Sequence, residues 1–126
     1  MELERTIELD ATVEEVWELV ADPAERRAWV GAEADGAVVT EVVDGARLAW
    51  RWHDGDGAPE STVEVTVGRS DDGDRTRVIV VERRPAPSGG GGGGAARACS
   101  RWDDRLVGLE LGALVRRFSP AAVLAG

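Results

Sequence analysis

Alternating hydrophobic and polar residues open the chain and predict a strand. Over residues 2–10, Leu3, Ile7 and Leu9 fall on one side, whereas mostly acidic residues fall on the other. A period of two is typical of a strand with one buried face. Arg5 interrupts the apolar side, so we expect it either near the strand end or projecting towards a cavity.

Helical spacing replaces this alternation after residue 11. Thr12 and Glu15 have the spacing of a capping box, which predicts a helix start. The apolar stripe of this helix consists of Val13, Val16, Trp17 and Val20. Asp22 and Pro23 then have the residue types of an N-cap and a first helical position, so a second short helix follows and ends near Gly31.

Strand-like segments separated by short polar turns make up the middle of the chain. The strands are predicted at residues 37–43, 48–53, 62–67 and 76–82. Short strands joined by tight turns favour an antiparallel meander. If its register is regular, three residues form a charge ladder on the outer face. They are Arg51, Glu64 and Arg77.

Residues 85–100 have no periodicity and include a run of glycine at 89–94. Polyglycine has a high chain entropy and no side chains to pack, so we predict a Gly-rich loop within the domain. Its role is either that of a flexible insertion or that of a lid over a pocket.

A long helix is predicted from about Ser100 to Phe118. Its first apolar stripe is Trp102, Leu106 and Leu109, and its second is Val107, Leu111, Leu114 and Phe118. A helix that is apolar on two sides is expected to pack on two surfaces. One is the sheet, and the other is the paired short helices, a cavity or a second subunit. Gly108 and Gly112 indicate close backbone packing or, alternatively, a dimer seam.

Length and charge exclude several classes of protein. The 126 residues suit one domain, 1–126, and the net charge of -9 disfavours nucleic acid and anionic membranes as partners. A single cysteine, Cys99, excludes an internal disulfide, and a single histidine, His53, excludes a multi-histidine metal site. With no apolar run near the roughly 20 residues of a membrane span and no signal-peptide pattern, we expect a cytoplasmic protein.

Taken in order, these elements resemble the START-like (SRPBCC, helix-grip) superfamily, which includes polyketide cyclases and lipid-transfer domains. Within it, the chain is similar to small bacterial proteins that resemble the activator of the ninety-kilodalton heat-shock ATPase. The matching segments are Ile7-Glu8-Leu9-Asp10-Ala11 with Val16-Trp17, Asp22-Pro23 with Trp29, Val39-Thr40-Glu41-Val42, Leu48-Ala49-Trp50-Arg51-Trp52, Ser61-Thr62-Val63-Glu64-Val65-Thr66-Val67, Thr76-Arg77-Val78, and Trp102 with Leu106 and Leu109.

The resemblance implies an α+β helix-grip fold, in which a curved antiparallel sheet holds a long C-terminal helix. Such proteins usually have a strand hairpin before the Val39-rich strand, but here only residues 31–37 fill that gap. We therefore expect about five strands and a more open grip. The Gly-rich loop is a second departure from the usual pattern.

The resemblance also implies a cavity between the sheet and the last helix. The predicted ligand-binding residues are Trp50, Trp52, Val65, Val80, Glu82, Trp102 and Leu106. A mostly apolar lining suits a hydrophobic small molecule. The alternative is that these side chains fill the core, because a packed core and a lined pocket produce the same alternation.

Few residues suggest catalysis. Glu82 is a weak candidate for a general base, with Arg5 as its possible partner, and His53 is expected on the outer face. Asp54 and Asp56 resemble a calcium loop, but Ala58 stands where a third ligand is needed, so we predict no metal.

We predict a binding protein with no cofactor. The alternatives are a polyketide cyclase or aromatase-like enzyme and a co-chaperone-like interaction domain with a filled core. A homodimer through the second stripe of the last helix is also possible.

Overall fold

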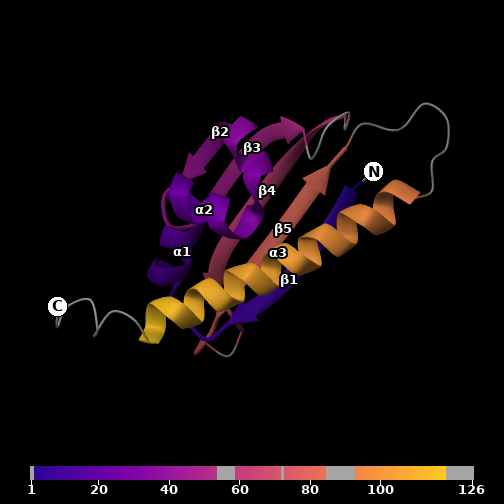
Figure 1. Cartoon of the computed structure of the whole chain (residues 1–126). Helices are drawn as coiled ribbons and strands as arrows, with labels where there is room; N and C mark the ends of the chain where they lie inside the picture. The colour runs from indigo at the N-terminus through magenta and orange to yellow at the C-terminus, as the bar shows by residue number, and fades with distance from the viewer. Residues whose placement is uncertain (1, 54–58, 72, 85–92, 119–126) are drawn as a thin grey trace.

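A computed structural model of the chain describes residues 2–53, 59–71, 73–84 and 93–118, with the backbone alone for 93–100 and 116–118. Its elements are β1 (Glu2–Leu9), α1 (Val13–Ala21), α2 (Pro23–Val30), the 3-10 helix η1 (Ala32–Gly36), β2 (Val38–Val43), β3 (Arg47–His53), β4 (Glu60–Arg69), β5 (Thr76–Arg83) and α3 (Gly93–Phe118). The strands form one antiparallel sheet of order β1-β5-β4-β3-β2, and the helices lie on one face of it (Figure 1). The predicted α+β architecture of five strands and a long last helix is confirmed.

Side-chain caps fix where the short helices begin. The Thr12 hydroxyl accepts the Glu15 amide at 3.1 Å, and the Glu15 carboxylate accepts the Thr12 amide at 3.2 Å. Asp22 accepts the amides of Ala24 and Glu25 at 2.9 and 3.1 Å. These contacts satisfy amides that have no partner within the helix, which confirms both predicted starts.

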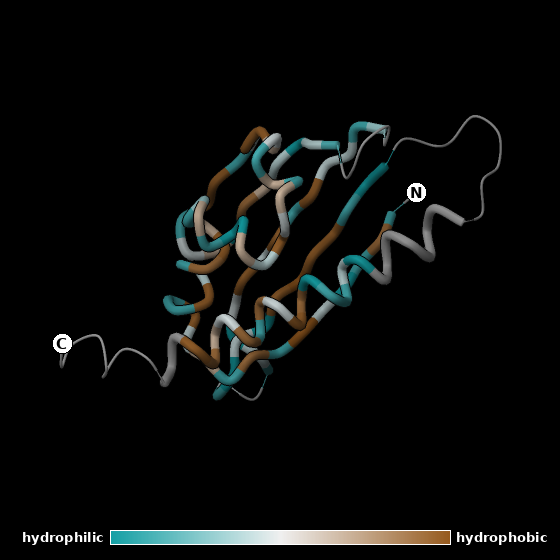
Figure 2. The backbone as a smooth tube through the Cα atoms, viewed as in Figure 1, coloured by the Kyte–Doolittle hydropathy of each residue, from teal (hydrophilic) through white to brown (hydrophobic). Residues whose placement is uncertain are grey.

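The hydrophobic core lies between the inner face of the sheet and the helices. Figure 2 shows that hydrophobic positions recur along the strands and helices that enclose it. The sheet contributes Leu48, Trp50, Trp52, Val63, Val65, Val67, Val78 and Val80. The helices contribute Val16, Leu19, Val20, Trp29, Val30, Trp102, Leu106, Leu109 and Ala113. The alternation predicted for the strands therefore does correspond to a buried inner face.

The last helix is longer than predicted. It begins at Gly93, so only the first part of the predicted 85–100 loop is left outside the helix. Alanine and arginine have high helix propensity, and the segment Ala95-Ala96-Arg97-Ala98 continues the helix backwards into the glycine run. Residues 85–92, which hold most of the glycines, lie outside the described residues.

The predicted charge ladder is wrong. The inner face sets the register by placing Trp50 opposite Val63. On the outer face this register leaves Glu64 between uncharged residues on β3 and β5. Glu64 instead approaches Arg47 at 3.8 Å and Arg83 at 3.9 Å.

The second apolar stripe of α3 does not pack on a second surface in the part of the chain that the structure describes. Val107, Leu111 and Leu114 are 59%, 57% and 39% exposed. Both β1 and the short helices contact α3, and Gly108 and Gly112 face the short helices at Trp29 and Leu19. The helix thus packs on the sheet and on the short helices, as expected, but the described residues of its second apolar stripe take no part and stay exposed. Close packing at the glycines is confirmed. The side chain of Phe118 lies outside the described residues.

Replacing Gly112 by alanine should stabilise the protein. A methyl group there would lie 3.8 Å from the Leu19 methyl carbons, an ordinary contact, and alanine favours a helix interior over glycine by about 0.5–1 kcal/mol. Urea unfolding should show a gain of that size. Gly31→Ala is the contrasting control, because φ is 113° there and a Cβ would lie 2.7 Å from a Glu33 oxygen, so stability should fall. A loss of stability in Gly112→Ala would contradict this packing.

Candidate functional site: a buried carboxylate among tryptophans

Glu82 on β5 is a fully buried carboxylate that accepts hydrogen bonds at both oxygens. Ser61 Oγ and Trp52 Nε1 donate to Oε2 at 2.7 and 3.3 Å. Trp102 Nε1 and Arg84 donate to Oε1 at 3.1 and 3.3 Å. A carboxylate only accepts, so donors on all sides suit it and offset its removal from water.

These side chains come from three strands, the residue that follows β5 and the last helix. Trp52 on β3 pairs with Ser61 on β4, and Val63, two residues further along β4, pairs with Glu82 on β5. Trp102 reaches the same point from α3. The site thus lies where β3 ends, β4 starts and β5 ends, beside the N-terminal half of α3 (Figure 1).

Tryptophan rings surround the carboxylate in a connected series. The Trp52 and Trp102 ring centroids lie 6.1 Å apart, and Trp50 meets Trp52 edge to face at 5.6 Å. Trp29 continues the series at 6.5 Å from Trp102. Aromatic pairs at these separations contribute beyond simple burial. These four rings lie in the region that the resemblance assigns to a cavity.

Arg105 covers the helix side of this cluster. Its guanidinium carbon lies 4.8 Å from the Trp102 ring centroid and 5.0 Å from that of Trp52. The side chain is 7% exposed and donates from Nε to the Val30 carbonyl at 2.8 Å. A cation over two indole faces is held electrostatically as well as by packing, so Arg105 fixes both rings.

A second buried arginine lies on the other side of the tryptophan series. Arg26 donates to the carbonyls of Val20 and Ala21 at 3.0 and 3.1 Å, at the C-terminal end of α1, and lies 5.8 Å from the Trp50 ring. Burial lowers the pKa of Arg26, and the Asp22 carboxylate opposes that shift. Its Nε has no hydrogen-bond partner among the described residues.

The structure brings the predicted ligand-binding residues together. All of them are 3% exposed or less, on the inner face of the sheet or on the buried side of α3. Their role in binding stays a prediction. Arg5 pairs with Asp103 on α3 at 2.9 Å rather than with Glu82.

Sequence reasoning missed Ser61, Arg84 and Arg105 as members of this site. Ser61 could have been found, because it continues the inward side of Val63 and Val65. The contacts of Arg105 depend on how α3 is rotated, which its sequence does not specify. Asp54, Asp56 and the side chain of Cys99 lie outside the described residues.

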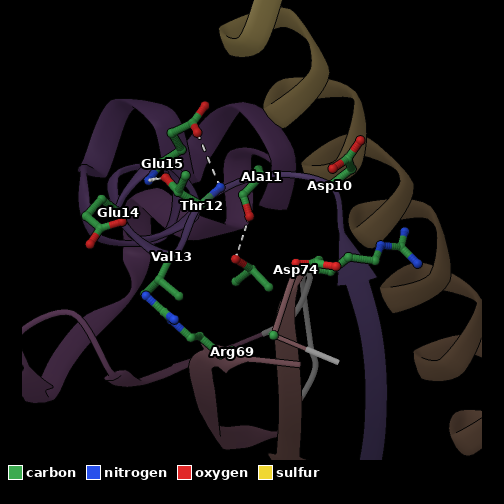
Figure 3. A pocket seen from close by; sticks show the side chains of 11 residues that line it. Asp10, Ala11, Thr12, Val13, Glu14, Glu15, Arg69 and Asp74 are labelled. Carbon is green, nitrogen blue, oxygen red and sulfur yellow. Dashed lines mark hydrogen bonds between the residues drawn. The ribbon is translucent and has the colours of Figure 1, made fainter. Parts of the chain in front are cut away.

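A polar surface cavity of about 480 Å³ lies at the opposite end of the grip, beside the start of α1 and the β4–β5 turn (Figure 3). Carboxylates and arginines both line it. Its charged residues are Asp10, Glu14, Glu15, Asp74, Arg69 and Arg75. Thr76 donates to the Ala11 carbonyl at 2.6 Å and ties the two walls together. The mixture of charges favours no single class of ligand.

No helix among the described residues is both long enough and apolar enough to cross a membrane.

No family model matches this chain. No curated protein matches it by sequence.

Solved structures do match it. DynU16, a protein of the dynemicin biosynthetic locus, is 26% identical with a TM-score of 0.70, and the match covers 86% of this chain but only 45% of DynU16. PFC0360w, an HSP90 activator from Plasmodium falciparum, is 18% identical with a TM-score of 0.65 over 88% of this chain and 94% of its own. The Aha1 dimer from Colwellia psychrerythraea is 10% identical with a TM-score of 0.69 over 90% and 96%.

These matches extend over nearly the whole described chain and include the activator type that the sequence pattern resembles. At such low identity a structural match carries the fold and leaves the activity open. The chain therefore has the START-like, helix-grip fold.

Proposed function

We propose that this protein binds a hydrophobic, ring-bearing small molecule that carries a hydroxyl group, at the end of the grip where Glu82 lies. The observation that carries the proposal is the buried Glu82 carboxylate within a wall of tryptophan rings. A few placed polar groups in apolar surroundings are typical of sites for small molecules. The indole faces would pack on the ligand, and the carboxylate would accept its hydroxyl.

Arg84 is the donor that such a ligand would replace. Its side chain is 13% exposed, whereas Ser61, Trp52 and Trp102 are 2% exposed or less. Turning Arg84 into solvent costs little compared with moving a buried ring, since a long charged side chain can keep its head group in water. Oε1 of Glu82 would keep the hydrogen bond from Trp102 and would accept a second one from the ligand.

The cyclase-like alternative has less support from the geometry. Each Glu82 oxygen already accepts two hydrogen bonds. A ligand hydroxyl and a substrate proton both need one of these donors to leave. The side chains that donate hydrogen bonds to Glu82 among the described residues are a serine, two tryptophans and an arginine, and none of them suits a general acid, so Glu82 is better placed as an anchor than as one half of an acid–base pair.

The test uses naphthol as a probe and the indole N–H signals of the five tryptophans in a nitrogen-15 NMR spectrum. Naphthol should shift the Trp52 and Trp102 signals, while the Trp17 signal, which reports a bond to Asp44, stays in place. Methoxynaphthalene lacks the hydroxyl donor and should bind at least about tenfold more weakly, because a hydrogen bond to a charged group is lost.

Glu82→Gln should weaken naphthol binding by a similar factor. Glu60→Gln is the matched control, since Glu60 lies at the same end of the sheet but is exposed and paired with Arg51. Equal affinity for the two probes, or shifts confined to Trp17, would count against the proposal.

A further inference from the structure

The edge strand β2 is uncovered on both faces. All six of its residues, Val38–Val43, are exposed, and Val38, Val39, Val42 and Val43 are 53%, 42%, 59% and 42% exposed. The strand pairs with β3 on one side, and within the described residues it has no strand on the other. An open edge rich in valine presents both unpaired backbone groups and apolar side chains.

The opposite edge of the sheet is protected in the usual ways. β1 carries Glu2, Glu4, Arg5 and Glu8, and it lies against α3. Charges and a covering helix are common devices against pairing between edges. In β2 the only charged residue is Glu41, and Arg47 of the same chain neutralises it at 2.8 Å. β2 is therefore better suited than β1 to pair with a strand of another molecule.

The sequence of β2 allows two copies of the strand to pair with each other. Its sequence, VVTEVV, reads nearly the same in both directions. An antiparallel copy centred between Thr40 and Glu41 places Val38 opposite Val43 of the other copy, and Val39 opposite Val42 of the other copy.

Opposed residues in an antiparallel pair must point to the same face of the sheet. In a regular strand, residues 39 and 42 would point to opposite faces. The β-bulge between Val39 and Glu41 changes this, since Val39 pairs with Trp50 and Val42 with Leu48, both on the inner face. Val38 and Val43 pair with Arg51 and Arg47, both on the outer face.

We propose that two copies of this chain pair through β2 about a two-fold axis and form one continuous sheet. The partner strand is β2 of a second copy, because the bulge turns opposed residues of the two near-palindromic strands to the same face of the sheet. Among the described residues β2 is the one open edge rich in valine, so each copy has a single such edge to pair and assembly stops at the dimer. Pairing through one short strand buries a small area, so the dimer should form reversibly with concentration.

The experiment is sedimentation velocity over a dilution series of the wild-type protein and two variants. Val42→Lys places a charge opposite Val39 of the other copy. Leu111→Lys is the matched control, since it makes the same change in polarity at a position on α3 that is 57% exposed against 59% for Val42. Both positions are at the surface, and circular dichroism of each variant verifies that it is folded.

The wild type and Leu111→Lys should change from monomer to dimer as concentration rises, and Val42→Lys should stay monomeric. Hydrogen exchange offers a second readout, because β2 amides of the wild type should become more protected at high concentration. A wild type that stays monomeric throughout would overturn the proposal. So would a dimer that persists in Val42→Lys and is lost in Leu111→Lys, because that result assigns the interface to α3.

Discussion

Replacing Glu82 by alanine is expected to cost about 3–5 kcal/mol of the free energy of unfolding, the range seen when one partner of a buried charged network is removed. The carboxylate is the shared acceptor for the Ser61 hydroxyl and the indole N–H groups of Trp52 and Trp102. These donors are 2% exposed or less, so water cannot replace the lost acceptor without rearrangement. Arg84 is the exception, because its side chain is 13% exposed.

Urea unfolding followed by tryptophan fluorescence measures this loss. Domains of this size are stable by about 5–15 kcal/mol, so the variant should be strongly weakened or partly unfolded without denaturant. Glu82→Gln keeps the shape and one acceptor oxygen and should lose less. A loss below about 1 kcal/mol in Glu82→Ala would mean that the buried donors find other acceptors, which contradicts the network described here.

Truncating Trp102 to alanine should cost about 3–5 kcal/mol, the usual range for a buried aromatic side chain. The ring is fully buried and lies between Trp29 and Trp52, with Arg105 over its face. Its removal leaves a cavity. Arg105 loses one of its two aromatic contacts, and Glu82 loses one hydrogen-bond donor. Thermal or urea unfolding should show the loss as a lower midpoint with little change in cooperativity.

Phenylalanine at two positions separates packing from hydrogen bonding. Trp102→Phe removes an indole N–H that donates to Glu82, whereas the Trp50 Nε1 has no partner among the described residues. Both rings are 1% exposed or less, so the packing loss is similar. Trp102→Phe should therefore be the more destabilising by about 1–3 kcal/mol. Equal losses would indicate that the Glu82 bond contributes little.

The order and type of the elements were readable from the sequence because they depend on local pattern. Thr12 with Glu15, and Asp22 with Pro23, are helix starts whose chemistry lies within a few residues, and the structure has both caps. Alternation in β3, β4 and β5 reported which side chains face inwards, since strand geometry turns each successive residue to the other face. Their order along the chain was sufficient for the START-like fold.

Long-range register and helix placement were decided only by the tertiary structure. The partners of Glu64 depend on which residues of three strands lie opposite one another, and the inner-face packing sets that alignment. Arg105 covers Trp52 only because α3 is rotated to bring it there.

The alternating pattern of β5 likewise predicted that Glu82 points inwards, but it did not predict which side chains Glu82 contacts. Ser61, Trp52 and Trp102 are far from Glu82 in sequence and reach it from separate elements. The sequence by itself thus determined which side chains of β3, β4 and β5 face inwards, because the direction of a strand side chain follows from local periodicity. Only the folded chain determined which buried groups touch, because contacts between distant residues depend on how the strands and α3 pack together.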